Sequence, residues 1–165
     1  STAVRLFSRE GYDATSTSKI AREADVSEGL IFRHFKNKQG LLDAILEQGQ
    51  QRTHVLFSAA LSKSKPEDIL KAVVGIPFEI NEREYDFWRL LYALKWQADV
   101  YDTSMSDLLR QGLVDVFEEL GYKDPAAEAE LVLVLTDGLA TAILLHKPER
   151  IQELQTAILN KYQLE

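Results

Sequence analysis

The 165-residue sequence predicts an all-α protein, in which a three-helix helix-turn-helix domain is followed by a larger helical domain. Apolar residues recur at every third or fourth position, and glycine, proline and hydroxyl residues fall between these periodic segments. No segment has the strict alternation of apolar and polar residues that predicts a strand. Two short helical segments joined by a tight turn precede a long one, as in a helix-turn-helix.

Four helices are predicted in the first part of the chain. The first ends at Gly11, because glycine is the usual residue after a helix C-terminus. Hydroxyls at 15–18, Ser27 and Asn37 are predicted to cap the next three. The expected bounds are a second helix from 15–18 to about 24, a third over 27–35 and a fourth over 38–61. The chain starts without methionine and inside a helical pattern, so we expect further residues upstream.

The polar stretch 47–54, EQGQQRTH, places the domain boundary, because a helix that is polar all round often bridges two cores. We expect a DNA-binding domain over 1–48 and a ligand-binding and dimerisation domain over 49–165. Five helices are predicted in the second domain, over 66–80, 84–98, 103–121, 125–146 and 148–162. The apolar run 131–145 is shorter than a membrane span and contains Asp137, so we interpret it as a buried helix.

The charge is unevenly distributed between these domains. Residues 1–48 carry seven basic and seven acidic residues, whereas residues 49–165 carry twelve and nineteen, and the whole net charge is −7. A neutral N-terminal domain next to an acidic second domain is expected where only the first domain binds a polyanion. The absence of cysteine excludes disulfides and thiolate sites and fits a reducing, cytoplasmic compartment.

The third helix has two different faces. Ile31 and Phe35 share one side and are predicted to be buried. The opposite side carries Gly29, Arg33 and Lys36, flanked by Leu30 and Phe32. Glycine allows close approach of another molecule, arginine binds guanine or phosphate, and apolar side chains contact thymine methyl groups. The alternative is that Phe32 packs on the first helix and that Arg33 is merely solvated.

Two helix N-termini extend the predicted DNA-binding surface. Lys38 lies in the first turn of the fourth helix, where a cation is unfavourable unless an anion such as phosphate is bound. The hydroxyls at 15–18 either bind a second phosphate or only cap their helix. The predicted DNA-binding residues are Ser16, Thr17, Ser18, Ser27, Glu28, Gly29, Leu30, Phe32, Arg33, His34, Lys36 and Lys38.

The segment GYDATSTSKIAREADVSEGLIFRHFKNKQGLLDAIL resembles the N-terminal DNA-binding domain of the TetR family of bacterial transcriptional regulators. The matching positions are Gly11, Tyr12, the hydroxyl run, Ile20, Ala21, Ala24, Val26, Ser27, Gly29, Phe35 and Lys38. The resemblance covers about residues 3–48. It implies a ligand-responsive repressor, not an enzyme, that binds a palindromic operator as a homodimer. It also implies a longer first helix with a basic arm.

Three positions depart from the family pattern. Asp25 stands at the turn position usually held by glycine, although aspartate tolerates a left-handed backbone at some cost. Phe32 replaces the usual tyrosine and has no hydroxyl to bind phosphate. Leu30 is bulkier than the small or hydroxylated residue that is common there.

The resemblance also implies roles for the second domain. The helices over about 125–162 would form the dimer, and an aromatic stripe would line a pocket for a small apolar or amphipathic ligand. The candidate ligand-binding residues are Phe78, Trp88, Tyr92, Trp96, Tyr101, Met105 and Asp137. From the residues alone, such a stripe is at least as consistent with plain core.

Two other classes of protein remain open at this point. A helical enzyme is one, although the scattered histidines His34, His54 and His146 have no metal-ligand spacing and no phosphate-binding loop or nucleophile motif occurs. No cofactor or metal is therefore expected. The other class is a helical adaptor of the same fold without specific DNA binding. No membrane association is expected.

Overall fold

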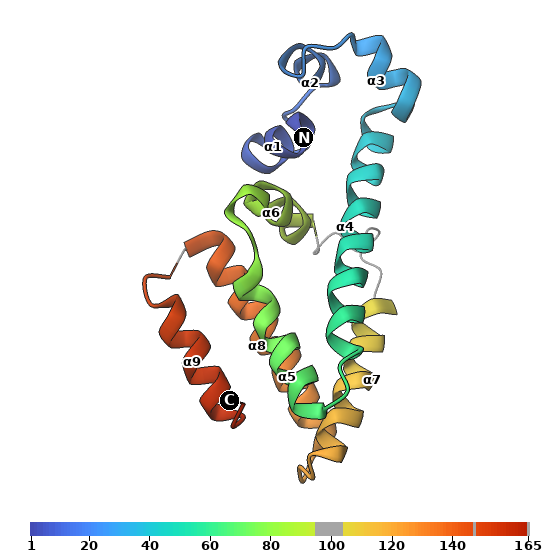
Figure 1. The fold of residues 1–165 in the computed structure, drawn as a ribbon. Coiled ribbons are helices and arrows are strands. Elements are labelled where there is room, and N and C mark those ends of the chain that lie inside the picture. Colours follow the sequence, from blue (N-terminus) through green and yellow to red (C-terminus); the bar gives the residue numbers. More distant parts are fainter. Residues whose placement is uncertain (95–103, 147, 165) are drawn as a thin grey trace. The chain divides into compact units, whose positions relative to one another are not determined.

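The computed structural model describes residues 1–94, 104–146 and 148–164, which form helices and no strand (Figure 1). The helices are α1 (Thr2–Glu10), α2 (Thr17–Glu23), α3 (Glu28–Phe35), α4 (Lys38–Leu61), α5 (Pro66–Gly75), α6 (Tyr85–Leu94), α7 (Ser104–Glu119), α8 (Pro125–His146) and α9 (Ile151–Lys161). Two short 3-10 helices, η1 (Ile76–Glu79) and η2 (Glu82–Glu84), separate α5 from α6. The all-α prediction is confirmed.

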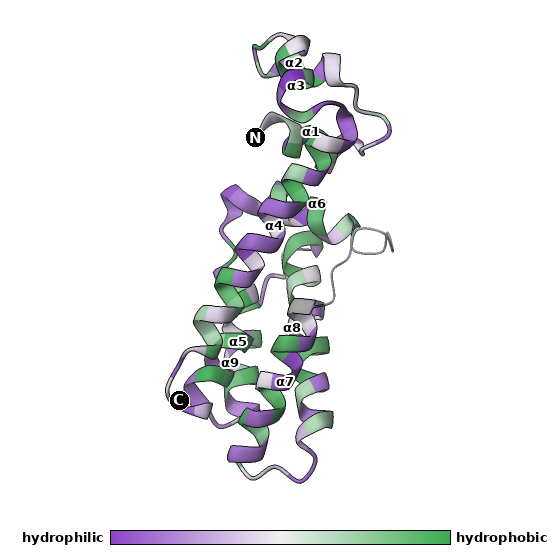
Figure 2. Ribbon diagram, turned by 90° about the vertical axis from the view of Figure 1, so that its right-hand side faces the viewer, coloured by the Kyte–Doolittle hydropathy of each residue, from purple (hydrophilic) through white to green (hydrophobic). Residues whose placement is uncertain are grey.

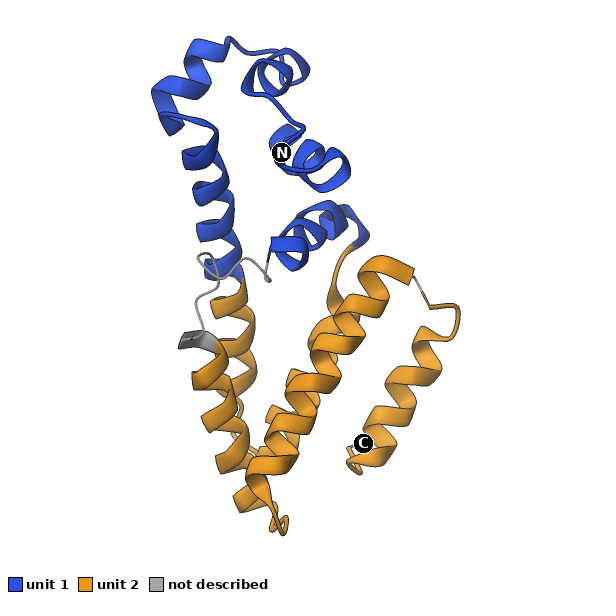
Figure 3. Ribbon diagram, turned by 180° about the vertical axis from the view of Figure 1, so that it is seen from behind, with its two compact units in different colours: residues 1–52, 82–101 blue, residues 53–81, 102–165 orange. Residues whose placement is uncertain are grey.

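The chain divides into two compact units (Figure 3). Unit 1 contains residues 1–52 and 82–101, and unit 2 contains residues 53–81 and 102–165. The division within α4 falls in the polar stretch 47–54, which is purple in the hydropathy view (Figure 2). Unit 1 thus includes α6, which we had expected to lie in the second domain.

Unit 1 has its own apolar core. Its buried residues are Ala3, Val4, Leu6, Phe7, Ile20, Ala21, Ile31, Leu41, Leu42, Ile45, Phe87, Leu90 and Leu94. Burial of each large apolar side chain stabilises the fold by about 1.5–3 kcal/mol. Helix α6 contributes three of these residues because the polar stretch of α4 accommodates it: a Cβ on Gly49 would lie 2.6 Å from the Leu91 side chain. Arg52 also binds Glu84 at 2.6 Å and lies over the Phe87 ring.

Unit 2 is built around α5, α7 and α8, with α9 against α5. Its most deeply buried large apolar residues are Phe117, Leu70, Leu113, Leu144, Val73 and Val132. The Phe117 ring also contacts the rings of Tyr122 and Tyr162. The start of α8 follows the predicted pattern: Gly121 has a φ of 74°, and the Asp124 carboxylate accepts a hydrogen bond from Ala127 N–H at 3.1 Å.

Helix α8 is long and apolar enough to cross a membrane by length and composition. It is largely green in Figure 2, and one third of its most apolar window is buried against the rest of the chain. A core helix of a protein outside the membrane passes the same test of length and composition. Asp137 is exposed on α8, on the side of the helix that the rest of the chain leaves open.

Candidate nucleic-acid interface

Local chemistry fixes the turn that orients α3 relative to α2. Asp25 has a φ of 56°, and the amide of Val26 donates to the carbonyl of Ala21 at 3.0 Å. This is the hydrogen bond of a Schellman motif, which normally places glycine at the left-handed position. Ser27 then begins α3, because its hydroxyl accepts a hydrogen bond from the Leu30 amide at 3.2 Å. The prediction of a left-handed Asp25 is confirmed.

The turn after α3 is equally constrained. A Cβ on Gly40 would lie 2.0 Å from the carbonyl oxygen of Phe35, so no other residue fits there without moving the backbone. Asn37 accepts a hydrogen bond from the Gly40 amide at 2.8 Å. Lys36, which lies between Phe35 and Asn37, has a φ of 66°. These contacts hold the C-terminus of α3 against the start of α4.

The two faces of α3 are as predicted. Ile31 is buried at 6% exposure, and Phe35 is half-buried beside it. On the other side, Leu30 and Phe32 are 39% and 45% exposed. Nearly half of the Phe32 side chain is thus accessible. A Cβ on Gly29 would meet nothing within 4 Å. The outward face of α3 is thus open, partly apolar and wide enough for another molecule to approach its backbone.

The charged groups on this face differ from those of Arg5 and Lys19. Arg5 pairs with Glu23, which lowers the pKa of that carboxyl through a hydrogen bond, and Lys19 pairs with Glu10. The charged groups of Arg33 and Lys36 form no ion pair or hydrogen bond with any residue that the structure describes. Both are exposed and available to an external anion. His34 is exposed next to them, with its ring 6.2 Å from that of Phe35.

The hydroxyls at the N-terminus of α2 have different roles. Ser16 caps the helix by accepting from the Lys19 amide at 3.2 Å, and it also bonds Ser18 at 3.0 Å. Ser16 and Ser18 are exposed. The Thr17 hydroxyl instead donates to the Glu28 carboxylate at 2.7 Å. Two residues that we predicted to contact DNA therefore contact each other, and this bond ties the start of α2 to the start of α3.

The ammonium group of Lys38 is hydrogen-bonded to backbone carbonyls of the protein. Its ammonium donates to the carbonyl oxygens of Tyr12 at 3.0 Å, Thr15 at 3.2 Å and Asp13 at 3.5 Å. It also lies 4.2 Å from the centre of the Tyr12 ring. These carbonyl partners could not be predicted from the sequence, because they lie more than 20 residues from Lys38 in the chain.

Comparison with known proteins identifies this arrangement. Residues 1–45 match the family model of the bacterial regulatory proteins of the tetR family. An uncharacterized HTH-type transcriptional regulator of Bacillus subtilis, YvkB, is 56% identical over 127 residues, which are 73% of this chain and 65% of that protein. Residues 1–45 therefore match the N-terminal domain of the TetR family. The chain spans less than two thirds of the length of YvkB.

Solved structures share this fold over nearly the whole chain. A TetR-like transcriptional regulator from Rhodococcus sp. RHA1 superposes with a TM-score of 0.78 at 21% identity, covering 98% of this chain and 91% of that one. AibR in complex with isovaleryl coenzyme A and operator DNA superposes with a TM-score of 0.72 at 17% identity, covering 97% and 93%. These likenesses confirm the expected fold class of a helix-turn-helix domain followed by a helical domain.

The candidate ligand residues of the chain are dispersed between the units. Trp88 and the half-buried Tyr92 belong to α6 in unit 1, where Trp88 packs edge-on against Phe87 at 5.5 Å. Phe78 belongs to η1 in unit 2. Trp96, Tyr101 and the side chain of Met105 lie outside the described residues. Trp88 is half-buried and packs against the core of unit 1.

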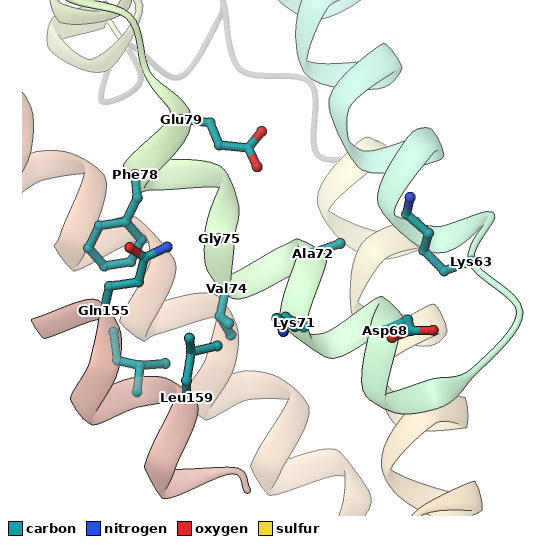
Figure 4. Close-up of a pocket in the computed structure, with 11 residues that line it drawn as sticks. Lys63, Asp68, Lys71, Ala72, Val74, Gly75, Phe78, Glu79, Gln155 and Leu159 are labelled. Atoms are coloured by element: carbon teal, nitrogen blue, oxygen red, sulfur yellow. The ribbon is translucent and has the colours of Figure 1, made fainter. Parts of the chain in front are cut away.

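An open cavity of about 460 Å³ lies within unit 2 (Figure 4). It is lined by Lys63, Asp68, Lys71, Ala72, Val74, Gly75, Phe78, Glu79, Gln155, Ile158 and Leu159. In Figure 4, Val74, Phe78 and Leu159 lie on one side and the charged Lys63 and Asp68 on the other. The lining thus combines apolar side chains with charged and polar ones. Among the described residues, no group of His, Asp and Glu side chains has the arrangement of a metal site.

Proposed function

We propose that this protein is a DNA-binding transcriptional regulator that inserts α3 into the major groove. The observation that carries the proposal is the outward face of α3, where Arg33 and Lys36 have no partner among the described residues and Gly29 leaves the backbone open. An α-helix fits the major groove, where arginine binds guanine and other cations neutralise phosphates. Ser16 and Ser18 at the N-terminus of α2 would contact the backbone of the duplex.

The apolar part of this face supports a preference for thymine. Leu30 and Phe32 flank the cations and are exposed in the free protein. In the major groove the only apolar group of a base pair is the C5-methyl group of thymine. Contact with that methyl group would bury both side chains, whereas phosphate would leave them without a favourable partner. Replacing thymine by uracil in the half-site should therefore weaken binding, and this loss should disappear in a Phe32→Ala variant.

The proposal includes a homodimer formed through α8. A stripe of small and apolar residues recurs at spacings of four and three along this helix: Ala127, Leu131, Val134, Gly138, Thr141 and Leu145. Three of its members are strongly exposed, at 45% for Leu131, 63% for Val134 and 62% for Leu145. Alternating spacings of four and three form the seam of paired helices. A two-fold dimer would then present two copies of α3 to a palindrome.

A small ligand is the proposed effector, and the cavity of unit 2 supports it. Its lining of apolar side chains together with charged and polar ones suits a molecule that has both an apolar and a polar part. AibR was solved with isovaleryl coenzyme A, a molecule of that kind. Native mass spectrometry of the protein purified from its host should detect a bound molecule, which is lost when Phe78→Lys fills the cavity with charge.

Selection from a pool of random duplex DNA tests DNA binding. We expect the intact protein to enrich an inverted repeat whose half-site centres lie about 34–36 Å apart. Arg33→Gln should abolish the enrichment, whereas Lys123→Gln, which removes an exposed lysine of unit 2, should not. A folded protein that enriches no sequence would instead be the adaptor that the same fold permits.

A further inference from the structure

Lys38 ties three carbonyl groups of one loop together. The loop over residues 11–16 joins α1 to α2, and the Lys38 ammonium lies 3.0 Å from the Tyr12 carbonyl oxygen and 3.2 Å from that of Thr15. The Asp13 carbonyl is the third acceptor, at 3.5 Å. An ammonium group has three N–H donors and no acceptor. The loop therefore supplies one acceptor for each donor of Lys38.

The same loop is held from its other side by Thr15. This residue has no exposed surface, and its hydroxyl donates to the Gly11 carbonyl at 2.8 Å. The Tyr12 ring, which lies against the ammonium, packs on Phe7 at 5.2 Å and donates its hydroxyl to Gln39. Lys38 is thus half-buried, with its ammonium hydrogen-bonded to the loop, in contrast to the exposed Lys36.

The loop ends at the part of unit 1 that faces DNA in the proposed function. Ser16 follows Thr15 directly and caps α2, and Thr17 bonds Glu28 at the start of α3. A loop held at its carbonyls fixes where α2 begins, and the bond from Thr17 to Glu28 transmits that position to α3. Release of the loop would let both helix N-termini shift together.

We propose that Lys38 is a positioning residue for DNA binding, which clamps the loop over 11–16 and thereby places α2 and α3, and that it is not a phosphate ligand. This inference rests on the proposed DNA binding and differs from the prediction that Lys38 binds phosphate. A phosphate ligand releases a counterion and so contributes to the salt dependence of binding, whereas a positioning residue does not.

The test compares Lys38→Met with Lys36→Met. Both remove one charge and keep an unbranched side chain. Binding of each variant to the selected duplex is measured over a range of KCl concentrations. Each phosphate contact contributes about 0.9 to the slope of log K against log salt concentration. We expect Lys38→Met to lower affinity about tenfold with an unchanged slope. Lys36→Met should lower the slope by about 0.9 per protomer.

Amide hydrogen exchange supplies a readout that needs no DNA. Lys38→Met should speed the exchange of the amides over residues 12–18, whereas Lys36→Met should leave them unchanged. Thr15→Val keeps every charge and loosens the same loop, so it should reproduce the loss of affinity at constant slope. Thr15→Val therefore still tests the inference if Lys38→Met fails to fold.

The outcomes separate the inference from the proposed function. A slope that falls in Lys38→Met as much as in Lys36→Met would show a phosphate ligand and overturn the inference. Unchanged loop exchange and unchanged affinity in Lys38→Met would overturn it as well. Failure of the wild-type protein to bind any selected duplex would refute the proposed function and, with it, the role of Lys38 in DNA binding. The hydrogen-exchange data would still decide whether Lys38 clamps the loop.

Discussion

Replacement of Gly29 by alanine should change stability and DNA binding in opposite directions. Gly29 is the second residue of α3, and a Cβ at this position would meet nothing within 4 Å in the free protein. Alanine is favoured over glycine in a helix by about 0.5–1 kcal/mol, because it loses less conformational freedom on folding. With no contact to oppose this gain, Gly29→Ala should raise the free energy of unfolding by about that amount.

The same methyl group would project from the open face of α3. If that face packs against base edges, the added methyl group overfills a close contact, which typically costs about 1–3 kcal/mol. The expected loss of affinity for the selected duplex is therefore about fivefold to a hundredfold for one α3 contact. A gain in stability together with a loss of affinity would show that Gly29 allows DNA to approach the backbone of α3 closely.

Urea unfolding followed by circular dichroism gives the stability, and fluorescence anisotropy with labelled duplex gives the affinity. Gly75→Ala is the matched control, since Gly75 ends α5 in unit 2 and is equally open. It should stabilise the protein and leave DNA binding unchanged. A Gly29→Ala variant that is more stable and binds with wild-type affinity would refute the proposed close approach.

Three further predictions concern the fold. Gly40→Ala should destabilise unit 1 by about 2–4 kcal/mol in urea unfolding, because its Cβ would lie 2.0 Å from a backbone oxygen. Asp25→Gly should raise the free energy of unfolding by about 0.5–1 kcal/mol at its φ of 56°, whereas Asp25→Ala should not. Burial raises the pKa of Tyr162 from its ordinary 10.0 to about 12, and its hydroxyl has no hydrogen-bond partner among the described residues. Because the unfolded chain loses this proton at a lower pH than the folded chain, the free energy of unfolding should fall as the pH rises from 10 to 12. Tyr162→Phe should not show this contribution to the fall. It should also be about 1 kcal/mol more stable at neutral pH, because it has no buried hydroxyl without a partner.

The helices were predictable because their ends depend on neighbouring residues. Ser16, Ser27 and Asn37 accept hydrogen bonds from amides three residues ahead, as their sequence positions indicate. The buried side of α3 followed from helical spacing, which placed Ile31 inward and Arg33 outward. Such features need only the geometry of one helix.

Features that depend on contacts between distant segments were not predictable. Lys38 has an anion-binding position in the sequence, yet its partners are carbonyls of a loop more than 20 residues away. Helix α6 carries part of an aromatic stripe that the sequence left open between core and pocket, and its place in unit 1 depends on Gly49, which leaves room for Leu91. Asp137 lies in an apolar stretch, yet it is exposed because α8 buries only one side.

Photo-crosslinking from position 32 tests most directly whether α3 meets DNA. Phe32 is 45% exposed, so replacement by p-benzoylphenylalanine keeps an aromatic side chain on the same face. The control is the same substitution at Val55, which is 66% exposed in α4 within unit 2. With the selected duplex bound, irradiation should link position 32 to DNA and leave position 55 unlinked. Bound DNA that crosslinks to position 55 and never to position 32 would contradict recognition by α3.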